Sequence, residues 1–309
     1  MNARARASRL GLGALGAYCL VSFLLFGLRL LVEPGWQYLG PQDDPQIAIW
    51  AFAWWPHAIL NGQNPFVTPD FWAPSGFNLT WSTSLPGLAL VFAPLTLAVG
   101  PVASYDVAAV LMPALAAWTA FLFCRRLTGA SCPSFAGGYL FGFSSYMIAH
   151  ESAGHLQLTA VFLVPLAALV VLDGVQGRLG GRRVLLRLGV LLAFQLLIST
   201  EVAVTVTLAL GVALALSFLL VPTTRGRIRS LLRPLAGAYA FAALLTAPFL
   251  YYVLSDFRRT INSPQAYVAI SSTSSSRPVS LSPPAGGQAG STCAGTAART
   301  APFSHSPRS

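Results

Sequence analysis

The sequence predicts an all-α integral membrane protein with about seven transmembrane helices, and three observations support this class. Of the 309 residues, 55% are hydrophobic and 9% are charged, with a mean hydropathy of +0.64. A soluble domain carries about 25% charged residues. Long apolar runs recur along the chain, and arginine clusters separate them. All 19 basic residues are arginine, so the net charge of +10 indicates positive-inside loops rather than a nucleic-acid partner.

The N-terminal segment predicts a first transmembrane helix that starts in the cytoplasm. Residues 1–9 carry three arginines and precede an apolar run at 10–32. As a helix this run is about 34 Å long, enough to cross a ~30 Å hydrocarbon core and longer than the apolar region of a signal peptide. We therefore expect residues 1–9 in the cytoplasm and residues 33–85 in a long first extracytoplasmic loop.

Two adjacent acids, Asp43 and Asp44, lie in this loop just before an aromatic-rich stretch. Asp44 followed by Pro45 is typical of a helix start, with Asp44 as the N-cap. Capping does not require Asp43, and a helix N-terminus keeps nearby carboxylates ionised. A fixed carboxylate at the membrane face is what a general base requires. Asp43 is thus a candidate base, and Asp44 is either a cap or the partner of a divalent metal, whose presence the sequence leaves open.

The helix after Asp44 and the next apolar run are both predicted to stay at the membrane surface. Four aromatic residues suit the headgroup layer, where they would shape a lipid-side groove: Trp50, Phe52, Trp54 and Trp55. The run 86–99 contains two prolines and is about 21 Å long as a helix, too short to cross. We interpret it as a juxtamembrane or re-entrant helix. The alternative, a short true span, would invert the topology of everything after it.

Six further apolar runs complete the predicted seven crossings. They occupy 104–123, 134–149, 157–173, 184–200, 202–221 and 234–254. Arginine clusters at 125–126, 178–187 and 225–233 are separated by pairs of these runs, as expected if all three clusters are cytoplasmic. The segment 184–221 would be about 57 Å long as one helix, so we expect it to turn back at 199–201.

This topology places nearly all acids and three of the four histidines on the outer side. His150 and His155 resemble the H-E-x-x-H zinc motif, but they are five residues apart, about 140° out of register on a helix, so a zinc protease is not predicted. Glu151 and His155 are four apart and would share a face. They are interpreted as a weak metal site or an acid–base pair, or else as part of a hydrogen-bonded polar loop.

Three more charged residues are candidates for substrate binding. Glu201 lies at a membrane turn, where a charge is costly unless it is paired or at the water boundary. It is interpreted as a site residue or as a boundary acid. Arg258 and Arg259 would bind the phosphate of a lipid-linked donor, or ordinary anionic headgroups.

The domain organisation predicted from these patterns is a multi-pass membrane domain at 10–265 and a low-complexity tail at 271–309. The tail is rich in Ser, Pro, Gly, Ala and Thr and has no acid. Such a segment buries too little apolar surface to offset its ordering entropy, so it is predicted to be disordered. The abrupt change also fits an out-of-frame or truncated end.

Several motifs together resemble the C-type glycosyltransferase superfamily. They are an N-terminal span, the paired acids, the aromatic helix, G-x-N-P-F at 62–66 and P-x-G-x-N-L at 74–79. The segment from Phe143-Ser144-Ser145 to His155, with the apolar run after it, is similar to a second outer loop of that superfamily. The likeness covers roughly residues 8–265. The chain departs from the pattern after residue 270, where relatives usually continue with more spans.

This resemblance implies an enzyme that moves a sugar from a polyprenyl-phosphate donor to a cell-envelope acceptor at the extracytoplasmic face. The catalytic acid would fall on Asp43, with Asp44 beside it. The implied partners are membrane lipids and the lipid-linked donor, and the implied location is a bacterial inner membrane. Two other classes stay open: a non-catalytic or truncated multi-pass protein, and a transporter or lipid flippase. A transporter favours acids near the middle of spans, whereas these acids lie at the ends.

Overall fold

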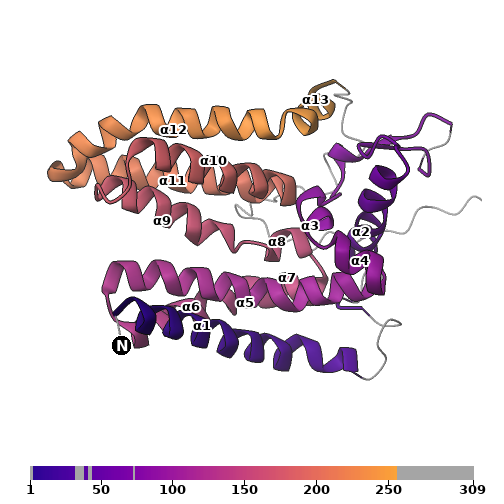
Figure 1. Ribbon diagram of the computed structural model, residues 1–309, viewed down its shortest axis with the longest axis horizontal. Helices are drawn as coiled ribbons and strands as arrows, with labels where there is room; N and C mark the ends of the chain where they lie inside the picture. Colours follow the sequence, from indigo (N-terminus) through magenta and orange to yellow (C-terminus); the bar gives the residue numbers. More distant parts are fainter. Residues whose placement is uncertain (1–2, 32–37, 41–43, 72–73, 256–309) are drawn as a thin grey trace, which may run out of the picture. The chain divides into compact units, whose positions relative to one another are not determined.

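The computed structural model describes residues 3–31, 38–40, 44–71 and 74–255, which are almost entirely helical (Figure 1). The helices of the first half are α1 (Ala3–Ser22), α2 (Asp44–Leu60), α3 (Pro86–Val91), α4 (Ala93–Val99), α5 (Pro101–Thr128), α6 (Ser131–Gly142) and α7 (Ser145–Ala153). Those of the second half are α8 (Leu156–Thr159), α9 (Leu163–Val175), α10 (Gly181–Ile198), α11 (Thr200–Leu220), α12 (Arg225–Leu245) and α13 (Ala247–Ser255). Short π and 3-10 turns lie at Phe23–Gly27, Leu28–Leu31, Leu79–Trp81 and Pro222–Thr224. The described strands, β1 (Val67–Thr68) and β2 (Phe77–Asn78), form an antiparallel pair.

Five helical segments are long and apolar enough to cross a membrane. They are Arg9–Gly27, Pro101–Thr128, Leu156–Val175, Thr200–Leu220 and Pro222–Leu245. The all-α class is therefore confirmed for the described residues, while the seven spans expected from the sequence exceed this number by two. The two additional expected spans fall on the broken segment α6–α7, of 12 and 9 residues, and on α10, whose 18 residues include three arginines.

One expected turn is confirmed by the structure, and one expected helix is divided. The run 86–99 was expected to form a single helix, but it forms two short ones, α3 and α4, of 6 and 7 residues, and neither is long enough to cross. The segment 184–221 turns back as expected. Ser199 has an extended backbone (φ −155°, ψ 114°), and its Oγ accepts a hydrogen bond from the Val202 backbone N at 3.3 Å. Ser199 thus ends α10 and caps α11.

The expected helix at 134–149 is wrong. The chain breaks after α6, and Ser144 begins α7 as an N-cap, with its Oγ accepting from Met147 N at 3.3 Å. The expected span 234–254 also has different boundaries, since α12 begins at Arg225 and α13 is a separate helix of 9 residues. Hydropathy alone does not predict either break, because each depends on the local backbone geometry.

α5 is the centre of the packing and contacts α1, α2, α4, α6 and α9. Its most apolar window is 56% buried, against 17% for α11. Small residues permit the close approach of α6, because a Cβ on Gly138 or Gly142 would overlap the backbone of Ala117. Such small-residue contacts are a common way for apolar helices to pack in lipid.

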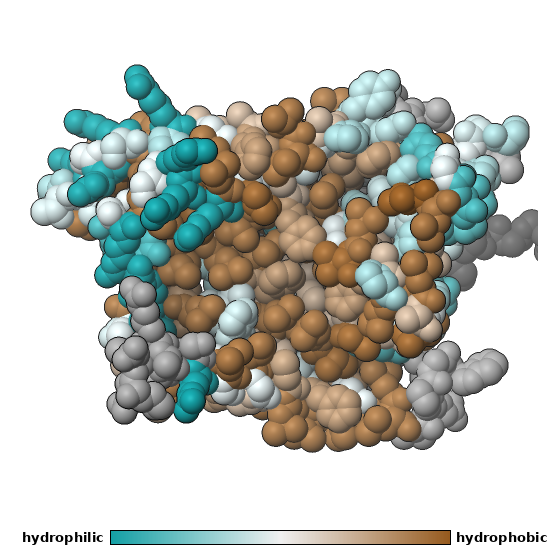
Figure 2. All heavy atoms as spheres, viewed as in Figure 1, coloured by the Kyte–Doolittle hydropathy of each residue, from teal (hydrophilic) through white to brown (hydrophobic). Residues whose placement is uncertain are grey.

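The three arginine clusters lie together at one end of the helices. Asp173 at the end of α9 pairs with Arg126 of α5 at 2.7 Å (Nε–Oδ1) and with Arg178 at 3.7 Å (Nη1–Oδ1). A Cβ on Gly177 would lie 3.0 Å from the guanidinium of Arg227 on α12. Figure 2 shows hydrophilic side chains gathered at this end and an apolar band beside them. We call this region the arginine end.

Candidate functional site

The candidate site is built where the end of α7 meets the start of α2, away from the arginine end (Figure 1). α7 stops at Ala153 because Gly154 adopts a left-handed backbone (φ 79°, ψ 21°). The Gly154 N donates to Glu151 O at 3.1 Å and the His155 N donates to His150 O at 2.9 Å. This C-cap geometry suits glycine and reverses the chain, so that His155 folds back beside the last turn of the helix.

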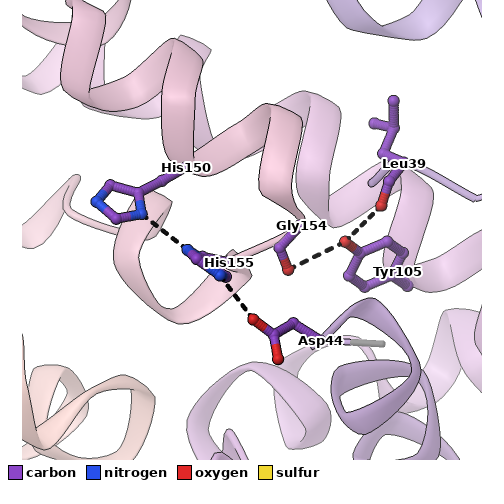
Figure 3. Close-up of polar contacts among 6 residues, drawn as sticks. All are labelled: Leu39, Asp44, Tyr105, His150, Gly154 and His155. Atoms are coloured by element: carbon purple, nitrogen blue, oxygen red, sulfur yellow. Dashed lines mark hydrogen bonds and ion pairs between the residues drawn. The ribbon is translucent and has the colours of Figure 1, made fainter. Parts of the chain in front are cut away.

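A chain of three polar side chains results, Asp44–His155–His150 (Figure 3). The Nε2 of His155 lies 2.6 Å from Oδ2 of Asp44, and the Nδ1 of His155 lies 2.9 Å from Nδ1 of His150. The side chains of His155 and Asp44 are 26% and 46% exposed, so this chain is open to the surface. We refer to it as the Asp–His–His chain.

The Asp–His–His chain corrects one interpretation of the sequence. The two histidines were expected to lie about 140° apart on a continuous helix. They are in contact because the helix ends between them. The pairing of Glu151 with His155 is not seen, since no ion pair joins them within the described part of the chain.

Backbone contacts hold Asp44 and His155 in place. A Cβ on Gly154 would overlap the ring of Pro45, and one on Gly40 (φ 101°) would lie 2.7 Å from the same ring and 2.9 Å from Gly154 Cα. The two glycine backbones therefore close around Pro45. Because Pro45 follows Asp44 and Gly154 precedes His155, this packing brings the carboxylate and the imidazole together.

Two polar residues at the start of α5, not identified from the sequence, fix the segment before α2. The Tyr105 hydroxyl donates to Leu39 O at 2.9 Å and lies 3.4 Å from Gly154 O (Figure 3). Asp106 Oδ1 accepts from Leu39 N at 3.1 Å. Both backbone groups of Leu39 are thus satisfied by adjacent residues of α5. In the sequence, these two residues could have been noticed only as a polar pair near the start of the apolar run at 104–123.

Glu151 lies behind the Asp–His–His chain in the protein interior. Glu151 is 3% exposed, and its Oε2 has no hydrogen-bond partner among the described residues. Burial raises the pKa of Glu151 to about 8, and the neighbouring Thr159 hydroxyl opposes this shift. Glu151 is therefore largely protonated at pH 7, as expected for an unpaired buried carboxyl group.

Glu201 lines a polar cavity of about 190 Å³ at the start of α11. Six hydroxyl-bearing residues and one amide share that lining: Thr80, Ser82, Thr83, Ser84, Ser199, Thr200 and Gln157. The Glu201 carboxylate is close enough to His150 to act on its pKa. Burial and the His155 ring lower the pKa of His150, and Glu201 opposes that shift.

An apolar groove of about 540 Å³ adjoins this hydroxyl-lined cavity. It is lined by Gln46, Ile47, Trp50, Phe71, Phe77, Leu79, Ser82 and Ser84. Ser82 and Ser84 belong to both linings, so the two hollows are adjacent. Trp50 contributes to the groove, as expected. Phe52, Trp54 and Trp55 are instead buried in the core, where the indole N–H groups bond Pro65 O and Ser84 O at 3.0 and 2.9 Å.

The structure thus brings together four predicted site residues, Asp44, His150, His155 and, at longer range, Glu201, and buries a fifth, Glu151, beside them. Asp43, Arg258 and Arg259 lie outside the described residues. Within the described residues no group of three or more His, Cys, Asp or Glu side chains has a metal-binding arrangement.

The fold and site define a helical, apolar protein with a polar constellation at one end of its candidate membrane spans. The chain belongs to the family described as Domain of unknown function (DUF6311), whose model matches residues 14–272. The matched region contains every candidate site residue. No curated protein and no solved structure matches this chain.

Proposed function

We propose that this chain is a membrane glycosyltransferase that moves a sugar from a polyprenyl-phosphate donor to a cell-envelope acceptor at the extracytoplasmic face. The observation that carries the proposal is that the apolar groove and the hydroxyl-lined cavity are neighbours that share Ser82 and Ser84 in their linings. A lipid-linked sugar has the same division between an apolar chain and a polyhydroxyl head. The resemblance in the loops at 62–66 and 74–79 supports the same reaction.

The two hollows suit the two parts of such a donor. Aromatic and aliphatic side chains of the groove match an isoprenoid chain, whose burial is driven by the hydrophobic effect. Hydroxyl and amide groups of the cavity, with the Glu201 carboxylate, match the hydroxyls of a sugar. The start of α2 links the groove to the Asp–His–His chain, because Gln46 lines the groove and Asp44 begins the chain.

We assign the remaining predicted residues the roles that the resemblance implies. The acid pair Asp43–Asp44 forms the catalytic end of the site, as the resemblance implies. Arg258 and Arg259 contact the donor phosphate, for which the guanidinium fork is well suited.

The proposed topology has seven crossings, with the broken segment α6–α7 and α10 added to the five candidate spans. The arginine end faces the cytoplasm and the Asp–His–His chain faces outward, in a bacterial inner membrane. The support is the gathering of Arg126, Arg178 and Arg227 around one end, as the positive-inside rule requires.

Reconstituted protein tests the reaction. The full chain in proteoliposomes is supplied with a radiolabelled polyprenyl-phosphate sugar, and transfer to acceptor is measured. Ile47 and Ile59 offer a matched pair on α2, since both are about half exposed (43% and 49%) but Ile47 lines the groove. We expect Ile47→Ser to raise the KM for the donor and Ile59→Ser to leave it unchanged. Movement of donor across the bilayer without transfer would instead identify a flippase.

A further inference from the structure

We infer that His150 is the catalytic residue that accepts the proton of the acceptor, with His155 and Asp44 as positioning residues behind it. This inference rests on the proposed function and deepens it, because it moves proton acceptance from Asp43 to a histidine. It follows from the order of hydrogen bonds in the Asp–His–His chain.

With an ionised Asp44 and two neutral rings, that order sets the tautomer of each ring. An ionised carboxylate only accepts hydrogen bonds, so the His155 Nε2, 2.6 Å from Asp44 Oδ2, carries a hydrogen. In neutral His155 the other nitrogen, Nδ1, is then an acceptor. His150 Nδ1, 2.9 Å away, must donate to it. The Nε2 of neutral His150 is consequently left with its lone pair, and it has no hydrogen-bond partner within the described part of the chain.

The surroundings of His150 favour this neutral, accepting form. Tyr146 of α7 packs edge-on against its ring with centroids 4.4 Å apart, and His155 packs at 5.2 Å. Glu201 of α11 acts on it electrostatically, while Glu151 is buried and largely protonated. Desolvation and His155 outweigh Glu201, so the pKa of His150 lies below its ordinary value of 6.5. A base that is neutral at pH 7 is ready to receive a proton.

Two other described candidates are less suited to meet an acceptor. Asp44 already uses Oδ2 to hold His155. Glu151 is 3% exposed, so a substrate does not reach it. His150 is the end of the Asp–His–His chain farthest from Asp44, and Glu201, which lines the hydroxyl-lined cavity, acts on it electrostatically.

The transfer is a displacement at the anomeric carbon of the sugar. The acceptor O–H gives its proton to His150 Nε2 while its oxygen forms a bond to the anomeric carbon of the sugar. The bond from that carbon to the phosphate oxygen breaks, and the polyprenyl phosphate leaves with the electron pair. The Nδ1 proton of His150 moves to His155 Nδ1, so the positive charge is shared with the ring beside Asp44. The carboxylate stabilises that charge, and the proton later returns to solvent.

The deciding experiment is a pH–rate profile of sugar transfer for the wild type, His150→Gln, Asp44→Asn and His57→Gln. His57 is the matched control, since it is an exposed histidine of α2 that contacts Asn61 rather than the Asp–His–His chain. We expect His150→Gln to lower kcat about 10²–10⁴-fold and His57→Gln to have no effect. The wild-type rate should rise with pH to a plateau, with its midpoint below 6.5 because the neutral form is the active one.

Asp44→Asn keeps an oxygen that accepts from His155 but removes the charge. We expect kcat to fall about 10–100-fold, the range for residues that orient a functional histidine. The midpoint of the profile should move to still lower pH, because the protonated pair loses its stabilising anion. A purely structural role for Asp44 would not move that midpoint.

Nitrogen-15 NMR of histidine-labelled protein separates the two proposals. If the wild type transfers no sugar, the proposed function fails, and the titration of His150 still tests the hydrogen-bond order. A lower His150 pKa in Asp44→Asn supports the chain, and an unchanged pKa overturns it. If the wild type transfers sugar but His150→Gln retains its kcat, or Asp44→Asn leaves the midpoint unmoved, the inference is overturned while the proposed function stands.

Discussion

The arginine end and the end that carries the Asp–His–His chain hold charged groups in different ways. At the arginine end one acid, Asp173, serves two arginines, and the Arg126 side chain is 38% exposed. At the other end the polar groups form a single line, in which Asp44 contacts His155 and His155 contacts His150. The first arrangement suits solvated charges that set orientation. The second arrangement fixes tautomers and therefore suits chemistry.

The glycines at the two ends show the same difference. Gly129 caps α5 at the arginine end with φ 69°, and a Cβ there would meet no atom within 4 Å. Gly154 caps α7 with φ 79°, but a Cβ there would overlap Pro45. Both positions favour glycine for its backbone, and only Gly154 also needs the missing side chain. The capping glycine at the Asp–His–His end is thus closely packed, and the capping glycine Gly129 at the arginine end is not.

The largest expected effect concerns which side of the membrane each end faces. We predict that a cysteine at the exposed position Gln63 reacts with an impermeant thiol reagent added from outside, in a background without native cysteines. A cysteine at Gly180, between α9 and α10, should react only after permeabilisation. The arginines nearby would keep that loop in the cytoplasm. The reverse labelling pattern would overturn the proposed topology.

The second prediction compares Asp43, which lies outside the described residues, with the Asp–His–His chain. The resemblance makes Asp43 the general base, so Asp43→Asn would lower kcat about 10²–10⁴-fold. The Asp–His–His chain predicts that His150→Gln has that effect and that Asp43→Asn has a much smaller one. Asn is nearly isosteric with Asp, so membrane insertion should be unchanged in both variants and is measured as the control. A large loss in Asp43→Asn with a small loss in His150→Gln would return the base to Asp43.

A third prediction uses the two capping glycines as a matched pair. Gly129→Ala should lower the free energy of unfolding by about 1–2 kcal/mol, the cost of a left-handed backbone for a residue with a Cβ. Gly154→Ala should cost about 1–3 kcal/mol more, because the methyl overlaps Pro45. It should also reduce transfer by separating His155 from Asp44. Unfolding in mixed micelles and the transfer assay measure both, and equal losses for the two variants would contradict the packing argument.

The sequence indicated local features well and tertiary contacts poorly. The turn at Ser199, the helix that starts at Asp44 and the short run at 86–99 were predictable, because hydropathy, proline and capping residues act within a few positions. The contact of His150 with His155 was missed because their spacing was judged by the geometry of a continuous helix, although Gly154 between them is a C-cap signal. Tyr105 and Leu39 are 66 positions apart, and no local pattern relates them.

The smallest expected effect tests whether the arginine end is separate from the chemistry. Asp173→Asn removes the partner of Arg126 and Arg178 but leaves both cations close to water. Exposed ion pairs contribute about 0–1 kcal/mol and weaken as salt rises, so the free energy of unfolding should fall within that range and only at low salt. Orientation should hold, because the substitution makes this end more positive. The transfer rate should equal that of the wild type in the same proteoliposomes. A loss of transfer without a change in unfolding would show that the two ends are coupled, and the division between an orienting end and a chemical end would then be wrong.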